Sequence, residues 1–163
     1  MYGGESGTDA ERAYYEAFKR KYARVTECQN EWVNEALQSK QLRVPTGLIF
    51  YFPDLKYTKS GYISGSTKAK NYPVQYFATG EVVPIGVMAM WRKLKKYGLK
   101  SYIDNTVHDS VKTSTWPEEA ELVQELAVEA LTVEVKNYMK NVYGIELTYP
   151  LEIDLTSGSH WGK

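Results

Sequence analysis

One segment of the chain, Thr106-Val107-His108-Asp109-Ser110, constrains the fold most strongly because it lies between two runs of β-type residues. These runs, Lys100 to Asn105 and Val111 to Thr115, predict an antiparallel hairpin with the segment at its tip. A carboxylate at such a tip projects out of the sheet, where a hard metal ion that handles phosphates can reach it. Aspartate is also a common turn residue, and a His-Asp pair at a hairpin tip taken alone is more often a simple turn than a metal site.

Helical patterns precede the hairpin in two places. Thr8 and Glu11 have the spacing of a capping box, and apolar residues at helical spacing continue from there to about Lys40. Val82 to Tyr97 is predicted to form another helix, directly before the hairpin.

The segment after the hairpin is expected to form a long helix. Thr115-Trp116-Pro117-Glu118 matches the sequence motif of a capping box, and Gly144 is predicted to end the helix. Apolar residues form one face of it. The six glutamates between Glu118 and Glu134 are interpreted as a solvated opposite face.

The remaining segments divide into strands and a loop. Leu42 to Val44 and Leu48 to Phe52 predict a second hairpin. Pro53 to Tyr72 has no clear periodicity and is predicted to be a long surface loop, and Tyr149 to Leu155 is predicted to be a closing strand. The fold class is therefore α+β, with helices first, then an antiparallel hairpin and a returning strand packed with two long helices.

Composition narrows the possible functions. A chain of 163 residues is long enough for one domain with one core. Its net charge is zero, so nucleic-acid binding would depend on local patches, such as Lys68 with Lys70 and the basic cluster from Arg92 to Lys100. The single Cys28 excludes an internal disulfide, and no apolar run is long enough for a membrane span. We therefore expect a cytoplasmic protein with no membrane partner, whose fourteen tyrosines suit interfaces.

Four stretches together resemble the C-terminal end of a family A DNA polymerase, the class that contains bacterial DNA polymerase I and many bacteriophage replicative polymerases. Val107 to Ser110 resembles motif C, and Asn71-Tyr72-Pro73-Val74-Gln75 resembles the run that opens the helix before motif C. Gly158 to Trp161 resembles the last residues of the family, and Tyr2 to Thr8 resembles the tail of motif B in the bacteriophage branch. Their order and spacing agree with the family over essentially the whole chain.

The resemblance implies a two-metal reaction. In this family two aspartates, one from motif A and one from motif C, bind two Mg²⁺ ions that assist attack of the primer 3′-hydroxyl on a deoxynucleoside triphosphate. Asp109 matches the motif C aspartate and is the implied metal ligand. His108 matches a residue that supports the primer terminus, so the two are the implied catalytic residues.

The resemblance also implies contacts with primer-template DNA. Asn71 and Gln75 match positions that contact template or primer, and Tyr2 matches the tyrosine that ends the fingers helix near the templating base. An arginine expected four residues before Asn71 is not present, and Lys68 and Lys70 are its possible substitutes.

Two departures from the family limit what the chain is expected to do alone. Ser110 stands where many members have glutamate, and a neutral hydroxyl is a weaker ligand for a hard cation. Motif A, with its aspartate, and the nucleotide-binding residues of motif B have no counterparts in the sequence. They are expected to lie upstream of Met1, on an N-terminal polymerase chain.

The leading hypothesis is therefore a split DNA-directed DNA polymerase that is active only in complex with that N-terminal chain. Residues 1–70 would be the C-terminal part of the fingers, a helical remnant, and residues 71–163 the C-terminal part of the palm with motif C. The location would be the host cytoplasm if the origin is a bacteriophage. The alternative is a non-catalytic DNA-binding or scaffolding module derived from such a polymerase. An independent metal nuclease is poorly supported, because the sequence shows no second acidic cluster.

Overall fold

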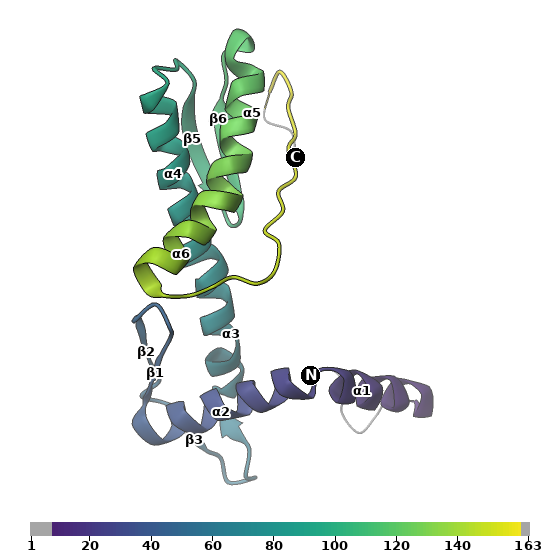
Figure 1. The fold of residues 1–163 in the computed structure, drawn as a ribbon. Coiled ribbons are helices and arrows are strands. Elements are labelled where there is room, and N and C mark those ends of the chain that lie inside the picture. The colour runs from purple at the N-terminus through teal and green to yellow at the C-terminus, as the bar shows by residue number, and fades with distance from the viewer. Residues whose placement is uncertain (1–7, 161–163) are drawn as a thin grey trace. The chain divides into compact units, whose positions relative to one another are not determined.

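The computed structural model describes residues 8–160, and the chain divides into two compact units between Pro73 and Val74 (Figure 1). This division corrects the expectation of one domain with one core. The buried side chains of the described residues form separate clusters, one in the first unit and two in the second.

The first unit begins with the predicted helices. The capping box of α1 is confirmed, because Glu11 Oε2 accepts a hydrogen bond of 2.7 Å from the backbone N–H of Thr8 while the Thr8 hydroxyl accepts from the backbone N–H of Glu11. The elements of this unit are α1 (Asp9–Lys21), α2 (Ala23–Ser39), β1 (Gln41–Arg43), β2 (Ile49–Tyr51), β3 (Lys56–Tyr57), β4 (Ile63–Ser64) and α3 (Ser66–Tyr76), whose last residues belong to the second unit.

The predicted hairpin after α2 is confirmed as β1 and β2. Leu42 of β1 pairs with Phe50 of β2 in an antiparallel register. Leu42 is buried against α2, where Val33 and Ala36 face it one turn apart on the helix. The hairpin and α2 therefore share one small apolar core.

The predicted loop from Pro53 to Tyr72 is wrong. Its first part contains β3 and β4, which pair as a very short antiparallel ladder, and its last part is the start of α3. Within this part of the chain α3 buries only a narrow stripe that includes Ala69, which is fully buried, and Pro73. A stripe made of one alanine and one proline gives no hydrophobic periodicity, so the helix was not visible in the sequence.

The second unit contains the predicted helix, hairpin and helix. Gly144 has a φ of 69° and ends the last helix, as predicted, because glycine adopts this left-handed conformation without strain. The elements are η1 (Phe77–Val82, a π-helix), α4 (Val83–Lys96), β5 (Tyr102–Val107), β6 (Ser110–Ser114), η2 (Pro117–Glu119, a 3₁₀ turn), α5 (Ala120–Val128), η3 (Glu129–Glu134, a π-helix) and α6 (Val135–Tyr143).

The second unit packs its helices against each other and against the hairpin (Figure 1). Met90 and Leu94 of α4 meet Val123 and Leu126 of α5, and the side chain of Ile103 on β5 packs against this cluster. A second cluster joins α4 to α6 through residues that include Val135 and Met139, both fully buried. The hairpin is thus packed on the helices α4 and α5, which form its helical support.

Gly86 allows α4 to lie close to η3, and its replacement should be costly. A Cβ at this position would overlap Leu131 Cδ2 and lie 3.4 Å from the Leu131 Cα. We expect Gly86→Val to lower the free energy of unfolding by about 1–3 kcal/mol through overpacking, measured from the denaturant midpoint. Lys95→Val, on the exposed face of the same helix, is the control and should cost less than about 1 kcal/mol. Equal losses for both variants would contradict the close approach.

The capping box predicted at Thr115 is not formed. The Thr115 hydroxyl lies 3.2 Å from the Thr113 hydroxyl, and the backbone N–H of Trp116 donates to Ser101 Oγ instead. The helix therefore begins with the 3₁₀ turn η2 before α5. The hydrogen bond from Trp116 to Ser101 has replaced the local N-cap that the sequence motif predicts.

The predicted closing strand from Tyr149 to Leu155 is also wrong. Leu151 and Ile153 are half-buried while Glu152 between them is exposed, so the side chains alternate as in a strand. Leu151, however, packs on the cluster that joins α4 and α6, away from any sheet edge. Among residues 8–160, β5 and β6 therefore form a ladder of two strands, and no third strand joins either edge.

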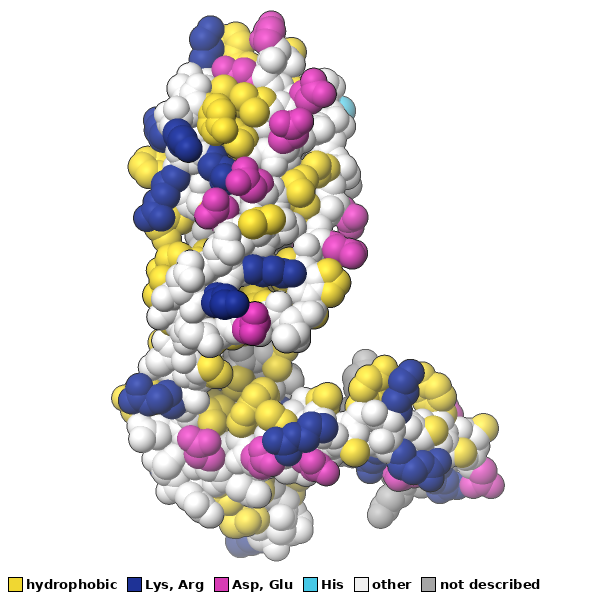
Figure 2. All heavy atoms as spheres, in the orientation of Figure 1, with side chains coloured by type: hydrophobic (Ala, Val, Ile, Leu, Met, Phe, Trp, Pro, Cys, Tyr) yellow, Lys and Arg dark blue, Asp and Glu magenta, His cyan; other side chains and the backbone are white. Residues whose placement is uncertain are grey.

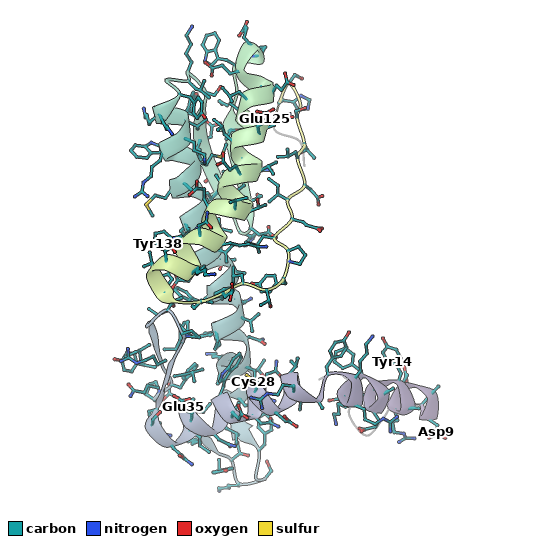
Figure 3. The ribbon with its side chains drawn as sticks, viewed as in Figure 1. Asp9, Tyr14, Cys28, Glu35, Glu125 and Tyr138 are labelled. Carbon is teal, nitrogen blue, oxygen red and sulfur yellow. The ribbon has the colours of Figure 1, made fainter. Side chains whose placement is uncertain are left out.

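The surface mixes charges of both signs with exposed aromatic side chains (Figure 2). The helix α1 buries none of its residues, and Tyr14 projects from it with 76% of its surface exposed (Figure 3). No helix within residues 8–160 is both long enough and apolar enough to cross a membrane.

Candidate functional site

The tip of the β5–β6 hairpin has the geometry that the sequence predicted. Val107 pairs with Ser110, so His108 and Asp109 are the two loop residues. His108 has a φ of 54°. A positive φ is uncommon for a residue other than glycine, and histidine is one of the residues that adopt it more often than most. The Ser110 hydroxyl donates a hydrogen bond of 3.0 Å to the carbonyl of Val107, which closes the turn.

The Asp109 side chain is exposed at this tip. Its carboxylate makes no hydrogen bond or ion pair with any other residue in the described part of the chain. A hard cation prefers such oxygen ligands, so the donor type fits Mg²⁺. Residues 8–160 contain no group of three or more His, Cys, Asp or Glu side chains placed to hold a metal ion. From these residues, Asp109 offers a single carboxylate ligand.

A partly buried hydrogen-bond network anchors the other end of the hairpin, and the sequence did not reveal it. The Glu119 carboxylate accepts from the backbone N–H of Lys100 at 3.0 Å, from the backbone N–H of Ser101 at 2.9 Å and from the Ser101 hydroxyl at 2.6 Å. Ser101 Oγ in turn accepts from the backbone N–H of Trp116 at 3.0 Å. Glu119 comes from η2, so the network ties the start of β5 and the chain after β6 to the helical support.

The acidic face predicted after Glu118 is therefore only partly solvated. Glu119 is held by the hairpin, and its hydrogen bond from the Lys100 N–H, followed by that from the Ser101 hydroxyl, lowers the pKa of the Glu119 carboxyl. Glu129 and Glu134 both pair with Lys93 of α4, at 2.8 and 3.3 Å. The sequence signal for these pairs is the basic run at the end of α4, whose charges were predicted either to complement the helix dipole or to bind phosphates.

The residues predicted to contact DNA lie on α3. Lys68 and Asn71 are exposed and Lys70 is half-buried; all three belong to the first unit. Gln75 is exposed in the second unit, where its backbone carbonyl accepts from the Thr79 hydroxyl at 2.8 Å. The structure brings His108, Asp109 and Ser110 together in one turn, whereas the α3 residues are spread along a helix that spans the boundary between the units.

Tyr2 and Trp161, which carried the two terminal parts of the resemblance, lie outside the described residues. His160 is exposed, and its ring Nδ1 lies 3.1 Å from the Ser159 hydroxyl. Of the described residues predicted for the site, His108, Asp109 and Ser110 lie on the hairpin and the others lie on α3.

Comparison with known proteins supports the resemblance. The chain matches a solved structure described as the POL domain of Pol1 from M. smegmatis in complex with DNA primer-template and dNTP, with a TM-score of 0.71 and 20% sequence identity. The match covers 90% of this chain and 24% of that one, so the chain spans about a quarter of that protein's length and shares its fold, helices mixed with small antiparallel sheets. Comparison with curated proteins gave no match. The sequence model of DNA polymerase family A matches residues 6–163, and the chain therefore belongs to DNA polymerase family A.

Proposed function

We propose that this chain supplies the motif C aspartate, Asp109, for template-directed nucleotidyl transfer by a DNA-directed DNA polymerase. The observation that carries the proposal is the position of Asp109 at an exposed two-residue turn, with its carboxylate unengaged by residues 8–160, in a chain that the family A model matches nearly end to end. The solved relative is in complex with primer-template DNA and dNTP, which are the partners proposed here.

Asp109 would bind Mg²⁺ through its carboxylate. Mg²⁺, when bound, would act as a Lewis acid that activates the primer 3′-hydroxyl and neutralises charge on the triphosphate. The contribution of this chain is to hold the carboxylate at a fixed place on the hairpin, because the backbone at the turn and the anchor at Ser101 restrict both ends of it. Ser110 would contribute little to the metal, since a neutral hydroxyl is a weaker ligand for a hard cation than a carboxylate.

The remaining candidate residues are proposed to bind DNA. His108 would support the primer terminus beside Asp109. Asn71 and Gln75 would contact template or primer through their amides, and Lys68 and Lys70 would neutralise phosphates. In this proposal residues 1–70 are the C-terminal part of the fingers, and residues 71–163 are the C-terminal part of the palm.

The second metal-binding carboxylate would come from a segment that carries motifs A and B, on a separate N-terminal chain. The support for this is that Asp109 alone offers one carboxylate, whereas the two-metal reaction of the family uses two aspartates. The two open edges of the β5–β6 ladder are suitable places for such a segment to pair.

Primer extension with Mg²⁺ and all four deoxynucleotides tests the proposal. The assay compares this chain alone, the candidate N-terminal chain alone and the mixture. We expect extension only in the mixture, because each chain alone lacks one of the two aspartates. A stable complex that does not extend the primer would overturn the catalytic proposal.

That result would support the alternative, a non-catalytic DNA-binding or scaffolding module derived from a polymerase. One observation favours it: the position where many relatives carry a glutamate is occupied by Ser110, whose hydroxyl is engaged in the turn. Under this alternative, the mixture would retain primer-template DNA in a mobility-shift assay without extending it.

A further inference from the structure

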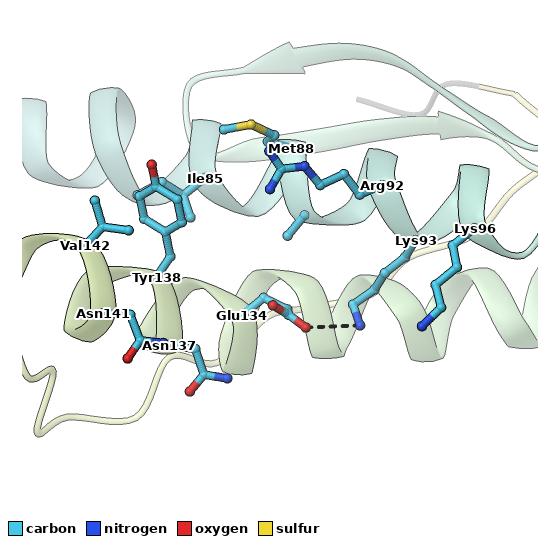
Figure 4. Close-up of a pocket in the computed structure, with 11 residues that line it drawn as sticks. Ile85, Met88, Arg92, Lys93, Lys96, Glu134, Asn137, Tyr138, Asn141 and Val142 are labelled. Atoms are coloured by element: carbon cyan, nitrogen blue, oxygen red, sulfur yellow. Dashed lines mark ion pairs between the residues drawn. The ribbon is translucent and has the colours of Figure 1, made fainter.

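A groove of about 460 Å³ runs between α4 and the helix formed by η3 and α6 (Figure 4). On the α4 side, the lining residues follow one stripe of the helix at intervals of three and four residues, from Ile85 to Lys96. A stripe of this length extends for roughly 16 Å, or about three turns, at 1.5 Å per residue. The groove is therefore long enough for a helix of a few turns to lie in it.

The chemistry of the groove changes along its length. Met88, Tyr138 and Val142 lie toward one end, the apolar end, whereas Lys96 lies toward the other, the basic end, and the Arg92 side chain extends along the groove toward Met88 (Figure 4). Met88 and Val142 are apolar side chains with 39% and 56% of their surfaces exposed. Apolar surface left in contact with water is a common mark of a protein-binding site.

The charges at the basic end favour a carboxylate as their partner. Lys93 is already neutralised by Glu129 and Glu134, which bind its ammonium group at 2.8 and 3.3 Å. Arg92 and Lys96 make no ion pair with residues 8–160. Arg92 and Lys96 are therefore two cations, close to the exposed Met88 and Val142, that could each bind a carboxylate of a partner.

A phosphate or nucleic-acid strand fits this groove less well than a polypeptide. Glu134 lines the groove and would repel a phosphate chain running along it. Tyr138 packs edge-on against Tyr143, with ring centroids 5.8 Å apart, so its ring is not free as a platform for stacked bases. A phosphate would also leave Met88 and Val142 uncovered.

We propose that the groove binds an amphipathic helix of another polypeptide, whose apolar side chains cover Met88 and Val142 and whose carboxylates meet Arg92 and Lys96. This is the helix-in-groove mode of recognition, in which residues three and four apart on one face of the partner make the contacts. The site lies on α4 and α6 and does not involve Asp109. The proposal is therefore independent of whether the chain takes part in nucleotidyl transfer.

The test uses the full chain and synthetic fluorescent peptides of about four helical turns. Each peptide carries leucines spaced three and four residues apart and a pair of glutamates one turn beyond them, at the C-terminal end in one peptide and at the N-terminal end in the other. Fluorescence anisotropy should detect saturable binding of one of the two. We expect the double variant Arg92→Glu, Lys96→Glu to weaken it by about tenfold or more, and a peptide with lysines in place of the glutamates to recover the loss.

Two controls distinguish this site from general charge attraction. Lys95→Glu changes an exposed residue on the same helix that does not line the groove, and it should leave the affinity within about twofold. Val142→Asp, at the apolar end, should weaken binding as the basic-end variants do. The proposal is overturned if neither peptide binds, if Lys95→Glu weakens binding as much as the double variant, or if inorganic phosphate or a single-stranded oligonucleotide displaces the peptide at equal concentration.

Discussion

Replacing Asp109 with alanine is expected to reduce the rate of primer extension by the reconstituted polymerase by on the order of a thousandfold or more, because a lost metal ligand removes several kcal/mol of transition-state stabilisation. The exposed tip gives no structural reason for the chain to unfold, since the Asp109 carboxylate bonds to nothing within residues 8–160. Complex formation with the proposed N-terminal chain and the proposed binding of primer-template DNA should therefore persist. Rapid-quench measurement of single-nucleotide addition separates the chemical step from DNA binding.

A second acid on the same hairpin provides the control. Asp104 Oδ2 accepts a hydrogen bond of 2.7 Å from the Ser114 hydroxyl, and asparagine can accept the same bond. Asp104→Asn should therefore extend primers at nearly the wild-type rate. An Asp109→Ala polymerase that matches the Asp104→Asn polymerase would show that the motif C carboxylate is not a metal ligand in this chain.

Replacing Ser101 with alanine is expected to lower the free energy of unfolding by about 1–2 kcal/mol, because it removes the hydroxyl that bonds to Glu119 and leaves the Trp116 N–H without its acceptor. Ser101 is 3% exposed; its hydroxyl donates to Glu119 and accepts from the Trp116 N–H. Urea denaturation followed by circular dichroism measures the loss. Ser114→Ala, which removes an exposed hydroxyl from the same hairpin, should cost at most about 0.5 kcal/mol, and an equal cost for both would contradict the anchoring role.

The same anchor should make stability depend on pH. The pKa of Glu119 is lowered from its ordinary value of 4.5 by the Lys100 N–H and the Ser101 hydroxyl. Its contribution to stability is therefore complete above about pH 4.5 and is lost as the pH falls through the lower, folded-state pKa. Glu119→Gln should flatten this acid-side decline, whereas Glu118→Gln, at the neighbouring exposed position, should not.

The sequence was sufficient to predict structural features that depend on residues close together in the chain. The hairpin with His108 and Asp109 at its turn follows from two β-type runs separated by turn residues, and the helix end at Gly144 follows from glycine's access to positive φ. The cap at Thr8 is equally local. Each of these features involves residues a few positions apart, where spacing alone fixes which groups meet.

Features decided by distant contacts were not predicted. Glu119 meets Ser101 eighteen positions away, and no pattern distinguishes it from a solvated glutamate such as Glu125. The π-helices η1 and η3 were also unforeseen, since an extra residue in a turn rotates the following helix face by about 100° and breaks the single 3.6-residue period. For the candidate site, the sequence located Asp109, but its chemical role depends on a second carboxylate that the described residues do not place beside it.

The two-stranded ladder of β5 and β6 also bears on how the chain behaves when it is handled in isolation. A strand edge that is open to a partner's strand is equally open to the same edge of another copy, and such pairing leads to aggregation. We expect the purified chain to lose solubility as its concentration rises, and to regain it when a partner strand occupies the edge. Co-expression with the partner would then decide how much soluble protein is obtained.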